Sequence, residues 1–155
     1  MVFITCKLST NLSLATSTHI HQGICRKELL GANPAIRPVV NQLEIHPWNT
    51  RTELVDFCTS QNIKIEAYSP LTKGRKLDDP TLVKIASKYD KTPAQVLIRW
   101  SLQHGYIVLP KSVSPERIAS NADIYDFDLS DSDMNALDAK DEYLLTGNVE
   151  ISTIS

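Results

Sequence analysis

One short basic stretch combines side chains that bind phosphate. Lys111 and Arg117 are cations, and Ser112 and Ser114 carry hydroxyl groups. The stretch directly follows the apolar run 106–110, and a serine followed by a proline is typical of a helix start, where unpaired backbone N–H groups favour an anion. Arginine offers phosphate a planar fork of donors, and lysine adds a point charge. Two interpretations stay open: a phosphate site, or an ordinary helix cap with Lys111 and Arg117 in solvent.

Two further residues with chemical potential lie near the ends of apolar runs. Gln42 falls late in the run 39–45, and Tyr68 ends the run KIEAY. A buried glutamine must satisfy both ends of its amide, which a carboxamide-bearing ligand or a network with neighbouring backbone would do. A tyrosine at the end of a strand either stacks on a flat ligand ring or covers the core. Both positions are therefore candidates for holding a ligand.

The patterns of several other kinds of site are missing from the sequence. The four histidines are scattered and predict no metal-ligand cluster. No glycine-rich phosphate loop or nucleophile motif occurs, and the chain has only five glycines. The acids at 78, 79, 131 and 133 stand at predicted helix starts, where they already have a structural role. We therefore expect no metal site and no nucleophile paired with a general base.

The elements that must position these residues alternate along the chain. The sequence predicts strands at 39–45, 64–70 and 106–110, and helical segments at 26–34, 51–62, 79–90, 92–105, 114–121 and 129–139. Strands separated by helices indicate βαβ units and a parallel sheet, whose ligands gather at the carboxyl ends of the strands. The pattern fits a doubly wound sheet or part of a (β/α)8 barrel. Three strands are few for a parallel sheet with both faces covered, which suggests that further strands are missing.

Composition narrows the class of protein. The 155 residues make up one domain's worth of chain, and the formal net charge of −2 argues against a nucleic-acid or acidic-membrane partner. Three scattered cysteines fit a reducing compartment, and no apolar run approaches the roughly 18 residues of a membrane span. We expect a cytoplasmic protein with no membrane partner. Residues 1–23 fit neither a transit peptide nor a secretory signal, so we expect a poorly structured leader there and the folded part at 24–155.

Several segments resemble one family in the same order. NQLEIHPWN (41–49), IEAYSPL (65–71), TPAQVLIRWSLQHG (92–105) and LPKSVSPERIASN (109–121) resemble the C-terminal half of the aldo-keto reductases, and 126–139 resembles the helix that follows. The resemblance covers about residues 26–140. It implies an α/β fold that is a partial (β/α)8 TIM barrel, with the C-terminal strands and helices present and the N-terminal strands missing. It also implies an oxidoreductase that transfers hydride between NADP(H) and a carbonyl or alcohol.

The resemblance implies which part of the cofactor each candidate residue contacts. Gln42 resembles the ligand of the nicotinamide carboxamide, and Tyr68 resembles the ring that stacks on the nicotinamide. The other expected contacts, running from the pyrophosphate to the 2′-phosphate and adenine, are Ser69, Leu71, Lys111, Ser112, Val113, Arg117 and Asn121. Ser120 stands where the family often has an acidic or amide residue. Because two basic residues are present at the phosphate end, we expect NADPH to be preferred over NADH.

The resemblance does not extend to catalytic residues. The family carries an Asp, a Tyr, a Lys and a His on its first four strands, and no segment of this sequence resembles those strands. We therefore expect a truncated chain that holds the cofactor-binding half, with a small carbonyl or alcohol as substrate only if missing strands complete it. The alternatives are a non-catalytic remnant that binds nucleotide, or an interaction module that pairs through exposed strand edges.

Overall fold

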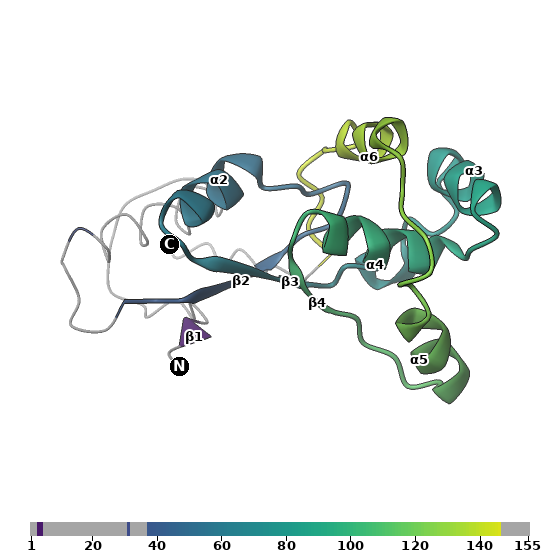
Figure 1. Cartoon of the computed structure of the whole chain (residues 1–155), viewed down its shortest axis with the longest axis horizontal. Coiled ribbons are helices and arrows are strands. Elements are labelled where there is room, and N and C mark those ends of the chain that lie inside the picture. The colour runs from purple at the N-terminus through teal and green to yellow at the C-terminus, as the bar shows by residue number, and fades with distance from the viewer. Residues whose placement is uncertain (1–2, 5–30, 32–36, 147–155) are drawn as a thin grey trace, which may run out of the picture.

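A parallel sheet organises the protein, seen in a computed structural model that describes residues 3–4, 31 and 37–146 (Figure 1). Its four strands lie in the order β1 (Phe3–Ile4), β2 (Val40–Glu44), β3 (Lys64–Tyr68) and β4 (Ile107–Leu109). The last three lie where the sequence predicted strands. Strand β1 comes from the segment expected to be poorly structured, and it pairs with the first two residues of β2. The rest of 1–23 lies outside the described residues.

Helices follow the strands, as the alternation of patterns predicted. They are α2 (Thr52–Ser60), α3 (Pro80–Lys88), α4 (Pro93–Gln103), α5 (Pro115–Ala122) and α6 (Asp131–Asp138), with a short 3-10 helix, η1 (Thr72–Gly74). Local capping determines three of the starts. Asp79 accepts from two backbone N–H groups of α3, Thr92 and Gln95 form a capping box on α4, and Ser114 caps α5. Of the helical segment expected at 26–34, only Gly31 is described, and it is helical.

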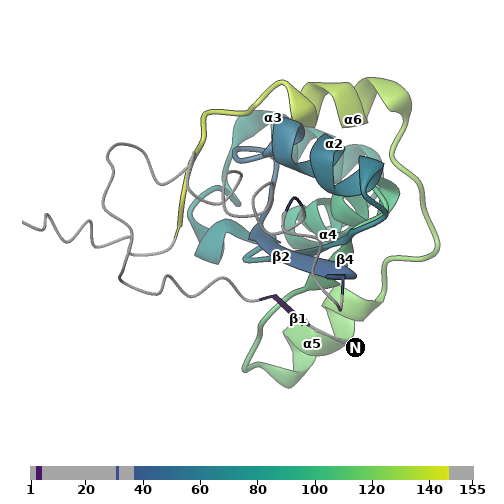
Figure 2. The ribbon, with the colours of Figure 1, turned by 90° about the vertical axis from the view of Figure 1, so that its left-hand side faces the viewer.

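One face of the sheet packs on the helices and forms the core. Figure 2 shows α2, α3 and α6 on the same side of the sheet, with α5 apart from them. Alternate residues of the central strands point into this layer, where they are buried with the indole of Trp100. The core members from the strands are Leu43, Ile65 and Ala67. Parallel strands need such a cover, because their alternate side chains are apolar.

The other face of the sheet is more open. Tyr68, Ile107 and Leu109 are 38%, 43% and 39% exposed, and Gln42 is half-buried. The apolar composition of 106–110 is typical of a buried strand, but Ile107 and Leu109 of β4 are exposed on this face. These residues point toward the side on which a closed barrel would have its interior.

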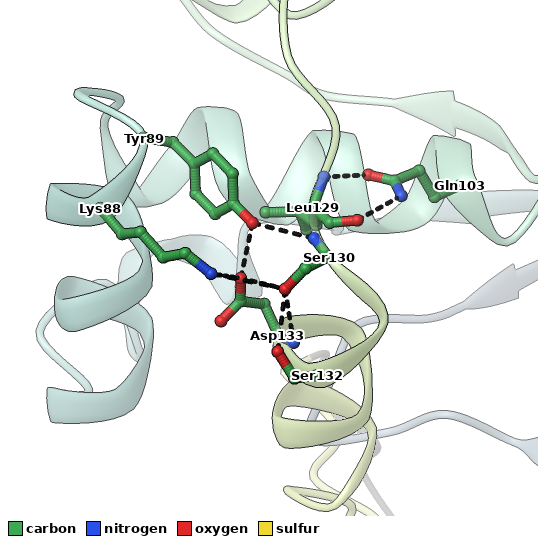
Figure 3. Close-up of polar contacts among 7 residues, drawn as sticks. All are labelled: Lys88, Tyr89, Gln103, Leu129, Ser130, Ser132 and Asp133. Atoms are coloured by element: carbon green, nitrogen blue, oxygen red, sulfur yellow. Dashed lines mark hydrogen bonds and ion pairs between the residues drawn. The ribbon is translucent and has the colours of Figure 1, made fainter.

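A polar cluster fastens α6 to the rest of the fold (Figure 3). The Asp133 carboxylate accepts from Lys88 Nζ and from the Tyr89 hydroxyl, both at 2.6 Å, and from the Ser130 hydroxyl at 2.6 Å. Ser130 also caps α6 by accepting from the Asp133 N–H. In a capping box the side chain at 133 would accept from the Ser130 N–H, but that N–H donates to the Tyr89 hydroxyl instead. Asp is one methylene shorter than Glu, and its carboxylate contacts the Ser130 hydroxyl and the side chains of Lys88 and Tyr89 but not the Ser130 N–H.

Candidate cofactor site

A cavity of about 650 Å³ lies at the carboxyl ends of β3 and β4. The loop after β3, the start of α4, the loop after β4 and helix α5 all contribute to it. It is lined by Ser69, Pro70, Leu71, Lys73, Gly74, Leu77, Thr92, Ala94, Leu109, Lys111, Ser112, Val113, Arg117, Ser120 and Asn121. This is the edge of a parallel sheet at which ligands bind.

The loop between β4 and α5 supplies the basic wall of the cavity. Ser114 Oγ accepts from the Arg117 N–H at 3.4 Å, and Ser112 Oγ accepts from the Ser114 N–H at 3.2 Å. The two hydroxyls thereby fold the loop into the first turn of α5. Lys111 and Arg117 are exposed, and neither pairs with an acidic side chain in the part of the chain that the structure describes. The wall therefore presents two uncompensated cations beside a helix N-terminus, an arrangement suited to phosphate.

The loop after β3 supplies a third cation, Lys73, which sequence reasoning missed. Ser69, Thr72 and Lys73 all have φ between 51° and 52°, and Gly74 follows at 81°. Left-handed conformations are unfavourable for non-glycine residues, above all for a β-branched threonine, and they concentrate where loops clamp ligands. Hydrogen bonds hold the turn, with the Thr72 N–H donating to the Ser69 carbonyl at 2.9 Å. A lysine three residues after the end of the predicted strand 64–70 was the available signal.

Seven of the nine residues expected to bind cofactor line this cavity. They are Ser69, Leu71, Lys111, Ser112, Val113, Arg117 and Asn121. Gln42 and Tyr68 lie outside the lining, on the open face of the sheet. Tyr68 is adjacent in register to Leu109 of β4, which does line the cavity. Tyr68 therefore lies next to two lining residues, Leu109 and Ser69, whereas Gln42 lies one strand further away and pairs in register with Glu66.

A buried carboxylate, Glu44, lies beside Tyr68. The two residues are partners in register on the same face of the sheet, and Glu44 is 5% exposed. Glu44 Oε1 accepts from the Thr146 N–H at 2.6 Å and from the Thr146 hydroxyl, and His46 Nε2 lies 3.5 Å away. Burial disfavours the charged carboxylate, but the contacts from His46 and Thr146 outweigh it and lower the pKa of Glu44 to about 2. A negative charge is therefore fixed next to the tyrosine.

The charge of Glu44 affects the pKa of the neighbouring Tyr68. Burial raises the pKa of the Tyr68 hydroxyl, and the negative charge of Glu44 raises it further, against the opposing effect of Arg51. Tyr68 is therefore neutral at physiological pH, with a hydroxyl proton to donate and an apolar ring. A neutral ring beside a cavity can stack on a flat ligand.

Two kinds of feature are absent from the described residues. Among residues 3–4, 31 and 37–146, no three His, Cys, Asp or Glu side chains come together to hold a metal ion. Within those same residues, no helix has the length and apolarity to cross a membrane.

The cavity suits a phosphorylated nucleotide on the chemistry of its donors. Its lining includes three cations and four hydroxyl-bearing side chains, and Asn121 adds an amide. Apolar surface from Leu71, Leu77 and Val113 is available to a base or a ribose. A ligand with phosphates in its middle or at one end and flat rings beside them matches this distribution.

Comparison with known proteins gives a consistent result. The sequence model of the Aldo/keto reductase family matches residues 23–142. Glyoxal reductase of Bacillus subtilis (strain 168) is 52% identical over 109 residues, which are 69% of this chain and 40% of that protein. The chain therefore spans less than half the length of this relative.

Solved structures agree. A Gox0644 mutant in complex with NADPH has 46% sequence identity and a TM-score of 0.71, covering 74% of this chain and 42% of that one. An aldo-keto reductase of Bombyx mori in complex with NADP has 36% identity and a TM-score of 0.71, covering 79% and 43%. With a family match over most of its length and close structural neighbours, this chain belongs to the aldo/keto reductase family.

Proposed function

We propose that this chain binds NADP(H) as part of an oxidoreductase that interconverts carbonyls and alcohols. The observation that carries the proposal is the cavity at the ends of β3 and β4, which gathers seven residues expected to contact the cofactor. Two relatives of similar fold were solved with NADPH or NADP. When bound, the nicotinamide gives or takes a hydride; the residues of this chain bind and orient the cofactor.

The residues divide between the two ends of the cofactor. Arg117 and Lys111 would hold the 2′-phosphate at the start of α5, because a guanidinium and an ammonium meet there without acidic neighbours lining the cavity. Ser69 and Lys73 would lie along the pyrophosphate. Tyr68 would stack on the nicotinamide, with Gln42 as the partner of its carboxamide.

In this proposal, the residues of this chain bind the cofactor, and residues on other strands transfer the proton. The Asp, Tyr, Lys and His that the family resemblance implies have no matching segment in this sequence. A small carbonyl or alcohol would accordingly react only in a barrel completed by strands outside this chain. The free, buried thiol of Cys58 fits a reducing compartment, and a cytoplasmic location forms part of the proposal.

Titration of the purified chain with NADP⁺ and with NAD⁺ by isothermal calorimetry tests the proposal. We expect NADP⁺ to bind more tightly, because only NADP⁺ carries the 2′-phosphate. Arg117→Ala should weaken NADP⁺ binding by roughly tenfold or more and leave NAD⁺ binding unchanged, since it removes charge-assisted hydrogen bonds. Lys84→Ala, an exposed cation on α3, is the control. Equal affinity for the two cofactors, or no binding of either, would overturn the proposal.

The exposed sheet face favours a second candidate, an interaction module that pairs through its outer strand. Ile107 and Leu109 of β4 expose two apolar side chains, and no strand pairs with the outer edge of β4 among the described residues. Sedimentation velocity at several concentrations distinguishes this candidate. A self-associating species that Leu109→Lys dissociates would support it, and a monomer at all concentrations would count against it.

A further inference from the structure

The segment 71–77 after β3 forms part of the cavity wall in a strained backbone conformation. Four of its residues line the cavity: Leu71, Lys73, Gly74 and Leu77. Thr72 lies among them, fully buried and with a φ of 52°. A β-branched residue keeps such a conformation only where its surroundings hold it there. The Lys76 N–H donates to Thr72 Oγ1 at 3.2 Å, so the hydrogen bonding that holds the turn continues as far as Lys76.

Residues 140–146, the C-terminal strap, contact the end of this segment. Lys76 Nζ lies 2.7 Å from Glu142 Oε1 and 5.7 Å from the centroid of the Trp48 ring. Just beyond the segment, Lys140 Nζ lies 3.2 Å from Oδ2 of Asp79, the residue that caps α3. Two ion pairs therefore join the C-terminal strap to the end of the segment 71–77 and to the helix start that follows it.

The C-terminal strap is itself anchored near the sheet. The N–H groups of Glu142 and Leu144 donate to the Trp48 carbonyl at 3.3 Å and 2.8 Å. The Thr146 N–H donates to Glu44 Oε1 at 2.6 Å, and both of these residues are buried. The strap therefore links the carboxyl end of β2 to the cavity wall, and it can restrain the wall from a fixed position.

We propose that Glu142 is a positioning residue for the cofactor, because its ion pair with Lys76 holds the segment 71–77 in the strained conformation that places Lys73 on the cavity wall. The inference rests on the proposed binding of NADP(H) and adds a residue to it. Without the pair, the strained segment relaxes in a fraction of the molecules, and the pyrophosphate loses the Lys73 ammonium in that fraction. The apparent affinity then falls in proportion to the fraction that keeps the binding conformation.

The sign of the effect separates positioning from simple charge attraction. NADP⁺ carries several phosphate charges, so the loss of a nearby negative charge strengthens its binding if electrostatic attraction is the only effect. Positioning requires the opposite result. We expect Glu142→Gln to weaken NADP⁺ binding by roughly two- to fivefold at low salt, the size of effect that a partly exposed ion pair gives. Asp78→Asn removes an exposed acid beside the same segment and is the matched control, with no weakening expected.

A second ligand restricts the effect to the pyrophosphate. Adenosine 2′-phosphate has the adenosine and its 2′-phosphate but no pyrophosphate, so Glu142→Gln should change its affinity by less than about 1.5-fold. In a Lys73→Gln background, Glu142→Gln should bring no further loss for NADP⁺, because the ammonium that it positions is gone. Glu142→Asp keeps the carboxylate and should retain most of the wild-type affinity.

Hydrogen exchange of the chain without ligand provides a measurement that does not depend on binding. In Glu142→Gln the amides of Gly74 and Lys76 should exchange faster, and the amides of α4 should be unchanged. Faster exchange throughout α4 would indicate general destabilisation and would overturn the positioning role.

The remaining outcomes distinguish this inference from the proposed function. If the wild-type chain binds both ligands, then unchanged or tighter binding of NADP⁺ by Glu142→Gln overturns the inference alone. An equal loss for both ligands, or additive losses with Lys73→Gln, would do the same. If the wild-type chain binds neither ligand, the proposed function itself fails, and the positioning role falls with it.

Discussion

Lys88 Nζ lies 2.6 Å from Asp133 Oδ2, and this contact joins the last turn of α3 to the first turn of α6. The two residues are 45 positions apart in the chain. Tyr89 and Ser130 donate to the same carboxylate, so one side chain satisfies three donors at the junction (Figure 3). The packing of α6 on the core therefore depends on a charge that is mostly covered.

Asp133→Asn should destabilise the protein by roughly 1–2 kcal/mol. The substitution preserves shape but removes the charge that strengthens three hydrogen bonds, of which the exposed Lys88 ammonium contributes the least. Urea unfolding followed by circular dichroism measures the loss. Asp131→Asn removes an exposed carboxylate from the same helical turn and should change the free energy of unfolding by only a few tenths of a kcal/mol. Equal effects of the two substitutions would contradict the role of the junction.

Stability should fall in acid between about pH 4.5 and about pH 2. The contacts described above lower the pKa of Glu44 from 4.5 and of Asp133 from 3.8, each to about 2 in the folded chain. A carboxyl group whose pKa is lower in the folded state contributes stability that is fully present above its unfolded pKa. That contribution is lost as the pH falls toward the folded pKa.

Urea midpoints measured at successive pH values check this expectation. The Glu44→Gln and Asp133→Asn variants should each show a shallower dependence on pH than the wild-type chain. A midpoint that stays constant from pH 5 to pH 2.5 would be incompatible with both shifts.

Asp138→Ala should lower the free energy of unfolding more than the loss of a half-buried carboxylate at the end of α6 would by itself. Asp138 Oδ1 accepts from the indole N–H of the buried Trp100 at 2.7 Å and contacts His104 Nε2 at 3.0 Å. Removing the carboxylate leaves the indole N–H without its acceptor, which costs about 1–3 kcal/mol. Tryptophan fluorescence during urea unfolding reports the loss, and Asn135→Ala, exposed on the same helix, is the control.

Lys73→Gln should weaken the binding of NADP⁺ by roughly three- to tenfold at low salt, because it removes one cation from the wall of the cavity. The difference from the wild-type chain should shrink as the salt concentration rises, since added ions screen the exposed ammonium. Calorimetric titrations at two ionic strengths test this, with Lys84→Gln as the matched exposed cation. A loss that does not depend on salt would point to a distorted loop instead.

Local chemistry made much of this fold predictable from the sequence. Asp79, Thr92 and Ser114 each precede a proline, and each caps a helix where predicted. The Ser114–Pro115 helix start also predicted that the loop 111–114 lies at the carboxyl end of a strand, which is where the cavity is. Such features depend on a few neighbouring residues, so the sequence carries them in one place.

Features that depend on distant residues escaped prediction. Glu44 and Thr146 meet across 102 positions, and nothing in either segment indicates the other. The approach of Lys73 to the cavity depends on consecutive left-handed residues that are not glycines, which propensity does not favour. The exposure of Ile107 depends on which elements cover that face of the sheet. The composition of the strand itself does not indicate this.

Helix α5 carries Arg117, one of the proposed phosphate donors, yet none of its side chains is buried. Its C-terminal end is held by Gln95, whose amide donates to the carbonyls of Ser120 and Asp123 at 3.1 Å and 2.9 Å. A helix held at one end unfolds locally more readily than the core does. A phosphate bound at its other end would shift this local equilibrium toward the folded helix. Slowed exchange of the α5 amide hydrogens would then report occupancy of the site without any turnover.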